Sequence, residues 1–194
     1  MTEDVRPYVI RTYDRWIILV IVLVVGYILF RPIFAFTAYY RGLSFERMLS
    51  IPPAMHYYQR SIDIDPNIPD GWIGLGTLYM MDGRVYKDDH DLAVSTFSRG
   101  AAANPKNAQL PFLLCRTDYE QGHHFKDALA ACLESVRRDP STNKFAWDYA
   151  AWSAVQTGDA TDAVHYWMQA LLIDPRYYNA QLAIARFRPL AKGI

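Results

Sequence analysis

The chain has 194 residues, of which 52% are hydrophobic and 14% aromatic, and its formal net charge is zero. This length suits one domain with an additional element, and the aromatic content excludes a disordered protein. The 20 basic residues are balanced by 20 acidic residues, so the chain lacks the overall positive charge that attracts nucleic acid, and we expect no nucleic-acid partner.

A short charged tail, residues 1–15, precedes an uncharged apolar stretch, residues 16–30. As a helix, this stretch would span about 22 Å, less than the roughly 30 Å of a bilayer core. Continuation to Phe36 gives about 31 Å, with Arg31 reaching the headgroups along its aliphatic stem and Pro32 bending the helix. We therefore expect a single transmembrane helix over residues 16–36. Its membrane-interface residues would be Trp16, Arg31, Tyr39 and Tyr40.

Two other interpretations of this stretch compete with a membrane span. A buried core helix would be unusual here, because this is the one helical segment without polar positions on any side. A cleaved signal peptide is disfavoured, because the tail contains acids and no small-x-small pair follows the apolar run. Arginines are balanced across the span, but the short tail favours an extracytoplasmic domain. We expect a single-pass protein of a bacterial inner membrane, in contact with the lipid bilayer.

A recurring helical motif begins at Trp72. The stretch Trp72–Tyr79 has the spacing W-x2-L-G-x2-Y, and it is followed by Ala93, Phe97 and the pair Asn104-Pro105. This order resembles the tetratricopeptide repeat, a helix–turn–helix unit of about 34 residues. Gly76 would leave room for the second helix, which offers Ala93 and Phe97 in return. The proline then ends that helix, because it disfavours helical backbone in the residue before it.

The motif recurs at regular intervals. An Asp or Asn followed by Pro stands at residues 65, 104, 139 and 174, which are 39, 35 and 35 residues apart. The second unit has Phe112, Cys115, Tyr119, Gly122, Ala128 and Cys132 at matching places, and the third has Trp147, Ala150, Ala151, Gly158, Ala163, Trp167 and Ala170. The first unit has about five extra residues around positions 85–91, and the second has Arg116 where a small residue is expected, so its helices would sit further apart.

The resemblance implies an all-α fold, with a right-handed superhelix of helical hairpins behind the membrane helix. Residues 37–68 would form a degenerate leading hairpin that continues almost directly from the span. Residues 69–188 would hold the repeat array, closed by a capping helix over residues 177–187. Residues 189–194 would form a C-terminal tail.

The two cysteines, Cys115 and Cys132, fall at apolar positions of the second repeat. Buried thiols in the core are the favoured interpretation. A single bridge between them is the alternative, if the domain lies outside the cytoplasm.

No group of residues has the pattern of a catalytic, cofactor or metal site. The glycines at 71, 74 and 76 follow no strand and lack dinucleotide-loop spacing. The run from Lys87 to Asp91 lacks the spaced oxygens of a calcium loop, so we expect a turn in which Asp89 or Asp91 caps the next helix. His123 and His124 are adjacent, which makes their rings diverge on a helix. We expect no enzyme activity, no cofactor and no small-molecule substrate.

In tetratricopeptide arrays, set positions of each first helix line the inner wall, where protein partners bind. The resemblance places eleven residues there: Ile73, Thr77, Met80, Met81, Leu110, Leu113, Thr117, Phe145, Asp148, Trp152 and Val155, with Glu120, Gln121 and Gln156 beside them. This wall would be largely apolar and adaptable through its methionines. The carboxylate clamp of co-chaperone members, built from lysine, asparagine and arginine, has no equivalent at the corresponding places.

The sequence therefore predicts a non-catalytic, membrane-anchored scaffold or docking subunit that binds protein partners within a larger membrane complex. The alternative is a transient assembly factor or chaperone-like adaptor for membrane or exported proteins.

Overall fold

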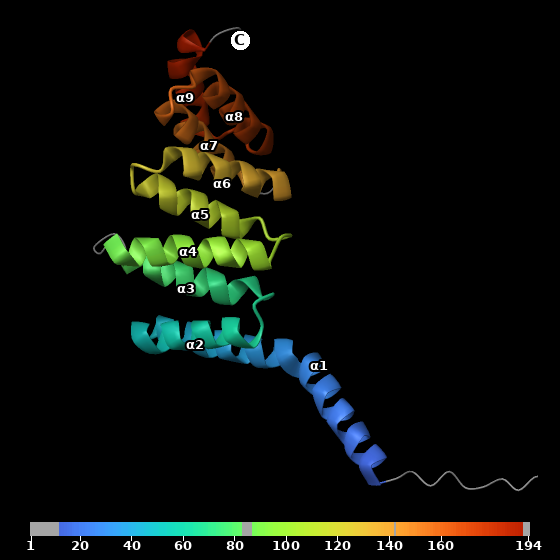
Figure 1. The fold of residues 1–194 in the computed structure, drawn as a ribbon. Coiled ribbons are helices and arrows are strands. Elements are labelled where there is room, and N and C mark those ends of the chain that lie inside the picture. The colour runs from blue at the N-terminus through green and yellow to red at the C-terminus, as the bar shows by residue number, and fades with distance from the viewer. Residues whose placement is uncertain (1–11, 83–86, 142, 192–194) are drawn as a thin grey trace, which may run out of the picture.

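The computed structural model describes residues 12–82, 87–141 and 143–191, and these ranges are helical apart from short turns. The helices are α1 (Thr12–Arg47), α2 (Ile51–Ile64), α3 (Pro69–Asp82), α4 (Lys87–Ala103), α5 (Gln109–Glu120), α6 (Phe125–Arg138), α7 (Lys144–Gln156), α8 (Ala160–Ile173), α9 (Tyr178–Phe187) and the short 3-10 helix η1 (Arg188–Leu190). Helices pair as successive hairpins that stack upon one another, and part of α1 projects from one end (Figure 1). The all-α fold is as predicted.

The Asp-Pro pairs end helices as the sequence predicted. Asp65, Asp139 and Asp174 each leave the helix with extended backbone, the conformation that a following proline favours. Each carboxylate also accepts a hydrogen bond from the backbone N–H two residues on, at 3.0 to 3.1 Å. The side chain thereby stabilises the turn that leads to the next hairpin. The turns within the second and third repeats use glycine: Gly122 and Gly158 have φ of +80° and +91°, where a side chain would be strained.

The first repeat packs around Phe97, which is fully buried together with Ala93. A Cβ atom on Gly76 would lie 2.5 Å from Cε1 of Phe97, so the close approach predicted for this glycine is confirmed. The indole N–H of Trp72 donates to the carbonyl oxygen of Pro66 at 2.8 Å. Trp147 donates in the same way to Pro140 in the third repeat, so a tryptophan fixes α3 and α7 to the turns before them.

Helix α1 belongs to two environments. Its C-terminal half packs on α2: Ala35 is buried, and its carbonyl oxygen accepts a 2.9 Å hydrogen bond from the Ser61 hydroxyl. The N-terminal half projects away from the stack (Figure 1). Pro32 lies inside α1, near the point where the two halves meet, and a proline there removes a helical hydrogen bond and bends the helix. The contact with α2 starts at Arg31, ahead of the boundary predicted at residue 37.

Helix α9 closes the other end of the stack, where a capping helix was predicted. Ala180 and Ala183 face α8 and are buried, and the ring of Phe187 stacks on Trp167 at a centroid distance of 5.5 Å. The prediction that Asp89 or Asp91 caps the second helix of the first repeat is wrong, because α4 already begins at Lys87 and both residues lie inside it.

Candidate partner-binding surface

The first helices of the repeats, α3, α5 and α7, contact one another in succession as well as their own partners. They form the continuous face on which the inner-wall positions were predicted. Four of those positions are not on a surface at all: Met80, Leu110, Leu113 and Thr117 are only 0% to 7% exposed. The prediction that these four residues line an accessible wall is wrong, because their side chains fill the core between helices.

In the second repeat the predicted positions were wrong because α5 was aligned to the motif one residue out of register. Cys115, not Arg116, occupies the small position that faces the second helix, because it is fully buried opposite Cys132. Arg116 instead points outward and pairs with Glu120 across one helical turn at 3.0 Å. Phe112 is partly exposed, and its ring meets Tyr149 of α7 at 6.0 Å. Phe112 and Arg116 are therefore the accessible residues of α5 at the inner-wall positions, and the sequence analysis did not place them there.

Asp148 has a structural role that the sequence did not reveal. Its two carboxylate oxygens accept hydrogen bonds from the indole N–H of Trp167 at 2.8 Å and from the hydroxyl of Tyr177 at 2.6 Å. The carboxylate thus joins α7, α8 and the turn before α9. Burial raises the pKa of Tyr177, and the hydrogen bond that its hydroxyl donates to Asp148 raises it further. Asp148 holds the end of the array together and is not a free anion for a ligand.

Trp152 also contributes to packing. Its ring meets Trp167 edge-on at 5.1 Å and Phe187 at 5.9 Å, yet one part of it stays accessible. Ile73, Thr77 and Val155 are likewise partly exposed. Met81 and Phe145 are the most open of the predicted set, at 58% and 48%. With the second repeat's register corrected, the predicted inner-wall positions that are accessible are Ile73, Thr77, Met81, Phe112, Arg116, Phe145, Trp152 and Val155, and these eight residues are called the inner face below.

The predicted membrane-interface residues divide between two roles. Trp16 and Tyr40 are exposed, as interface residues would be. Arg31 instead donates from Nε to the carbonyl oxygen of Ile64 and lies 3.9 Å from the Asp65 carboxylate. Tyr39 packs its ring 5.7 Å from that of Tyr58 in the first hairpin. Arg31 and Tyr39 therefore also take part in the contact between α1 and α2, and their place in the lipid headgroup layer stays a prediction.

Residues 15–47 of α1 are long and apolar enough to cross a membrane, and none of the most apolar window is buried. The large apolar side chains of residues 16–30 are each 47% to 69% exposed. Exposure of this kind on all sides excludes a buried core helix for this stretch.

Cys115 and Cys132 form a disulfide, with their Cα atoms 5.1 Å apart. It joins α5 to α6 within the second repeat, and both residues are fully buried. The favoured prediction of buried free thiols is therefore wrong, and the alternative of a single bridge holds.

A pocket between α4, α5 and α6 gathers titratable side chains, among them His90, Asp118, His124 and Asp127. Burial raises the pKa of Asp118 to about 6, and the nearby Asp127 adds to this shift. Burial lowers the pKa of His90, whose Nε2 has no hydrogen-bond partner in the described part of the chain. Across residues 12–82, 87–141 and 143–191, no three His, Cys, Asp or Glu residues are placed to hold a metal ion.

The other segments that could suggest chemistry have packing roles. A Cβ atom on Gly74 would lie 2.8 Å from the ring of Tyr58, and one on Gly71 would lie 3.1 Å from Ile62. Together with Gly76, these glycines admit the neighbouring helices and do not form a phosphate loop. The rings of His123 and His124 lie 6.4 Å apart, and His124 faces Asp127 at 3.6 Å.

The sequence matches no family model and no curated protein. Its structure is similar to several solved structures. The crystal structure of MamA matches with a TM-score of 0.66 and 16% identity over 76% of this chain and 82% of that chain. PilF of Pseudomonas aeruginosa matches with a TM-score of 0.65 and 17% identity over 82% of this chain and 70% of the other. YrrB, described as a TPR protein with an unusual peptide-binding site, matches with a TM-score of 0.63 and 15% identity over 79% and 75%.

At these identities, the similarity shows the fold alone. It agrees with the motif at Trp72, with the repeated Asp-Pro stops and with the stacked hairpins of α3 to α8. The chain therefore has the tetratricopeptide fold, closed at one end by α9 and continued at the other into an exposed apolar helix.

Proposed function

We propose that this protein is a non-catalytic, membrane-anchored scaffold, which docks a protein partner as a subunit of a larger membrane complex. One observation carries the proposal: the exposed apolar half of α1 is continuous with the half that is locked into the first hairpin. One continuous helix, α1, thus forms both the proposed anchor and part of the first hairpin, with no flexible linker between the two.

The exposed half of α1 needs a covering, because a contiguous apolar surface of this size is unfavourable in water. Residues 16–30 would span about 22 Å as a helix. Ile33, Phe34 and Phe36 extend the exposed apolar surface beyond Arg31, while Ala35 and Ala38 are buried on the side that packs on α2. The apolar surface therefore reaches further on the side of α1 that faces away from the array, which supports a bilayer as the covering.

The disulfide supports an extracytoplasmic array. Bridges of this kind persist in oxidising compartments, such as the bacterial periplasm, and are rare in the cytoplasm. This supports an inner-membrane protein whose repeats lie outside the cytoplasm. Attachment to the membrane would raise the effective concentration of the array near membrane partners.

The inner face is suited to a helix or an extended segment of a partner. It presents partly exposed aliphatic and aromatic side chains next to the Arg116–Glu120 ion pair, the mixture of apolar contacts and polar edge found at protein interfaces. The peptide-binding site named for YrrB supports the same use of the fold. Binding would be non-covalent, through shape complementarity and apolar contacts.

Photo-crosslinking in intact membranes tests the docking surface. Thr77 and Val155 are suitable positions for a photoreactive residue, since both are partly exposed on first helices. Ser98 of α4 and His165 of α8 are matched controls, because they are exposed on second helices. We expect one protein partner to be crosslinked from Thr77 and Val155 and not from the controls. Equal crosslinking from all four positions would contradict an inner-face site.

Gentle detergent extraction separates the proposed role from the alternative of a transient assembly factor. A permanent subunit is recovered in fixed stoichiometry with its complex by mass spectrometry of the intact assembly. An assembly factor is recovered alone or in substoichiometric amounts.

A further inference from the structure

A pocket of about 280 Å³ lies in the seam between α1 and α2, where the outer half of α1 leaves the stack. The six side chains that define its chemistry are Tyr27, Phe34, Thr37, Arg41, Tyr57 and Arg60. The first three and Arg41 come from α1, and the other two come from α2. The pocket therefore joins the apolar stretch to the first hairpin of the array.

The walls of this pocket change character along α1. Tyr27, Phe34 and Arg41 are spaced by seven residues, so they follow one face of the helix. From Tyr27 to Arg41 the axis advances about 21 Å. Tyr27 belongs to the stretch proposed to lie in the bilayer, whereas Arg41 lies beside the array. One end of the pocket is consequently apolar and the other is cationic.

The cationic end holds two arginines, one from each helix. Among the described residues, neither Arg41 nor Arg60 pairs with a carboxylate, unlike Arg31, which faces Asp65. The Arg41 guanidinium lies 5.9 Å from the centre of the Tyr57 ring, a contact that orients the group but does not neutralise it. Both residues line the pocket and are exposed, so their positive charge is available to a molecule that occupies it.

Two guanidinium groups near one opening suit a phosphate, because each can donate two hydrogen bonds to its oxygens. A free phosphate would need only this end of the pocket. A phospholipid uses both ends, since its acyl chains can lie along Tyr27 and Phe34 while its headgroup meets the arginines. The geometry points to a binding site for one anionic phospholipid, with its phosphate between Arg41 and Arg60. This inference rests on the proposed membrane span.

A lipid held in this way would fix the orientation of the array. It would contact both halves of α1 and also α2, so the first hairpin would be held at the membrane surface at two points. The partner-binding face would then be presented at a constant angle and not sweep freely about the bend at Pro32.

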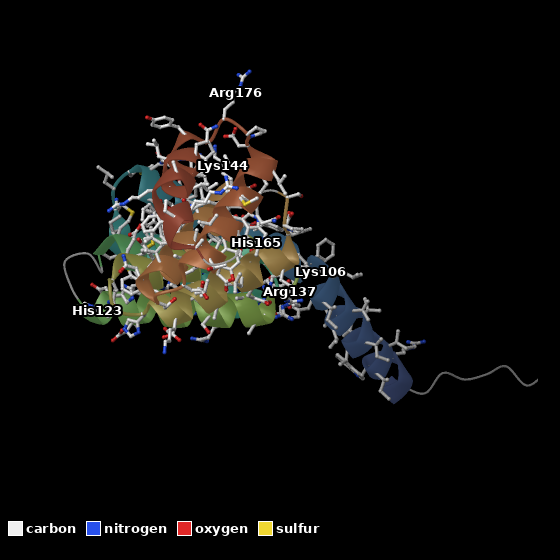
Figure 2. The ribbon with its side chains drawn as sticks, turned by 90° about the horizontal axis from the view of Figure 1, so that it is seen from above. Lys106, His123, Arg137, Lys144, His165 and Arg176 are labelled. Atoms are coloured by element: carbon white, nitrogen blue, oxygen red, sulfur yellow. A yellow bond between two sulfur atoms is a disulfide. The ribbon has the colours of Figure 1, made fainter. Side chains whose placement is uncertain are left out.

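Native mass spectrometry of the full-length protein in detergent tests the pocket. The protein is titrated with phosphatidylglycerol, with phosphatidylcholine and with inorganic phosphate. We compare the wild type with Arg41→Gln/Arg60→Gln and with a charge-matched control, Arg176→Gln/Arg188→Gln. Arg176 lies at the edge of the stack away from the projecting part of α1 (Figure 2).

The wild type and the control should each retain one phosphatidylglycerol, and Arg41→Gln/Arg60→Gln should bind it roughly tenfold more weakly or worse. Phosphatidylcholine should bind more weakly than phosphatidylglycerol to the wild type. Equal binding by all three proteins, or equal weakening in the control, would overturn the site. Displacement of the lipid by inorganic phosphate at comparable concentration would overturn the lipid assignment.

Reconstitution into phosphatidylcholine nanodiscs separates this inference from the proposed function. All three proteins should be incorporated, because none of the substitutions lies in the apolar stretch. Failure of the wild type to enter nanodiscs would contradict the membrane span and therefore the lipid site as well. Incorporation of all three proteins with equal lipid binding contradicts the pocket alone.

Discussion

Arg31 donates a hydrogen bond from Nε to the backbone carbonyl oxygen of Ile64, which lies 33 residues further along the chain. Ile64 is the last residue of α2, and the final carbonyl groups of a helix have no partner within it. The positive guanidinium satisfies one of these groups and favours the negative end of the helix dipole. One arginine thus attaches the base of the projecting helix to the array.

Replacement of Arg31 by alanine should destabilise the first hairpin, because it removes a charge-assisted hydrogen bond and leaves Ile64 and Asp65 without their cation. We expect a loss of about 1–3 kcal/mol, seen as a lower midpoint of thermal unfolding by circular dichroism in detergent. Arg176→Ala is the control and should leave the midpoint unchanged. An unchanged midpoint for Arg31→Ala would mean that Arg31 serves the lipid headgroups and not the hairpin.

Gly76→Ala should destabilise the first repeat, because the added Cβ would lie 2.5 Å from the fully buried ring of Phe97. Overpacking of this kind costs about 1–3 kcal/mol. Gly26→Ala is a matched helical control, since nothing lies within 4 Å of a Cβ at that position. Thermal unfolding of both variants compares the two positions, and equal midpoints would contradict the close packing of α3 on α4.

Loss of the bridge between Cys115 and Cys132 should weaken the second repeat. The two cysteines are 17 residues apart in sequence, and closure of a loop of that length is worth about 3 kcal/mol in the chain-entropy model. The wild type should unfold at a lower temperature once reduced, while Cys115→Ala/Cys132→Ala should not respond to reductant.

Labelling of thiols in the denatured protein provides an independent check. Protein taken directly from cells should accept a maleimide reagent only after reduction. Labelling without reductant would contradict the bridge and, with it, the extracytoplasmic placement of the array.

Asp118 should make stability depend on pH. Its pKa is raised to about 6 in the folded protein, chiefly by burial, so the folded state binds more protons than the unfolded state between about pH 4 and about pH 6. Stability is therefore lost as the pH rises through this window. Asp118→Asn removes the effect and should exceed the wild type at about pH 7 by on the order of 1–2 kcal/mol.

The comparison of these two proteins isolates Asp118 from its neighbours. His90 has a lowered pKa, so its contribution is lost as the pH falls, but it is present in both chains. The difference in unfolding midpoint between Asp118→Asn and the wild type should grow between about pH 4 and about pH 7. A difference that is constant with pH would show that Asp118 does not titrate in this range.

The sequence predicts the repeats well because their defining contacts are local. Gly76 and Phe97 lie within one hairpin, and each Asp-Pro pair forms its own turn, so a period of about 35 residues carries the information. The second repeat was misaligned because it lacks both the tryptophan and the glycine of the motif. A count from the preceding proline corrects it, since ten residues lead from Pro66 to Gly76 and ten from Pro105 to Cys115.

The errors and omissions elsewhere come from contacts between elements. Hydropathy places Arg31 and Tyr39 at the end of an apolar run, but it does not show that α2 packs against that same part of α1. Asp148 has the sequence position of a groove residue, yet it bonds Trp167 and Tyr177 from two later elements. The disulfide depends on a 5.1 Å separation across a hairpin, which spacing alone does not fix.

Alkaline carbonate extraction of membranes from cells that make the full-length protein tests the central claim most directly, with the intact mass of the protein measured afterwards. We compare the wild type with Val22→Arg/Val25→Arg, which places two charges in the middle of the exposed apolar helix. The wild type should stay in the membrane pellet with its apolar stretch uncleaved, and the variant should be released or fail to accumulate there. Release of the wild type, or a mass that lacks residues 16–30, would contradict the anchor.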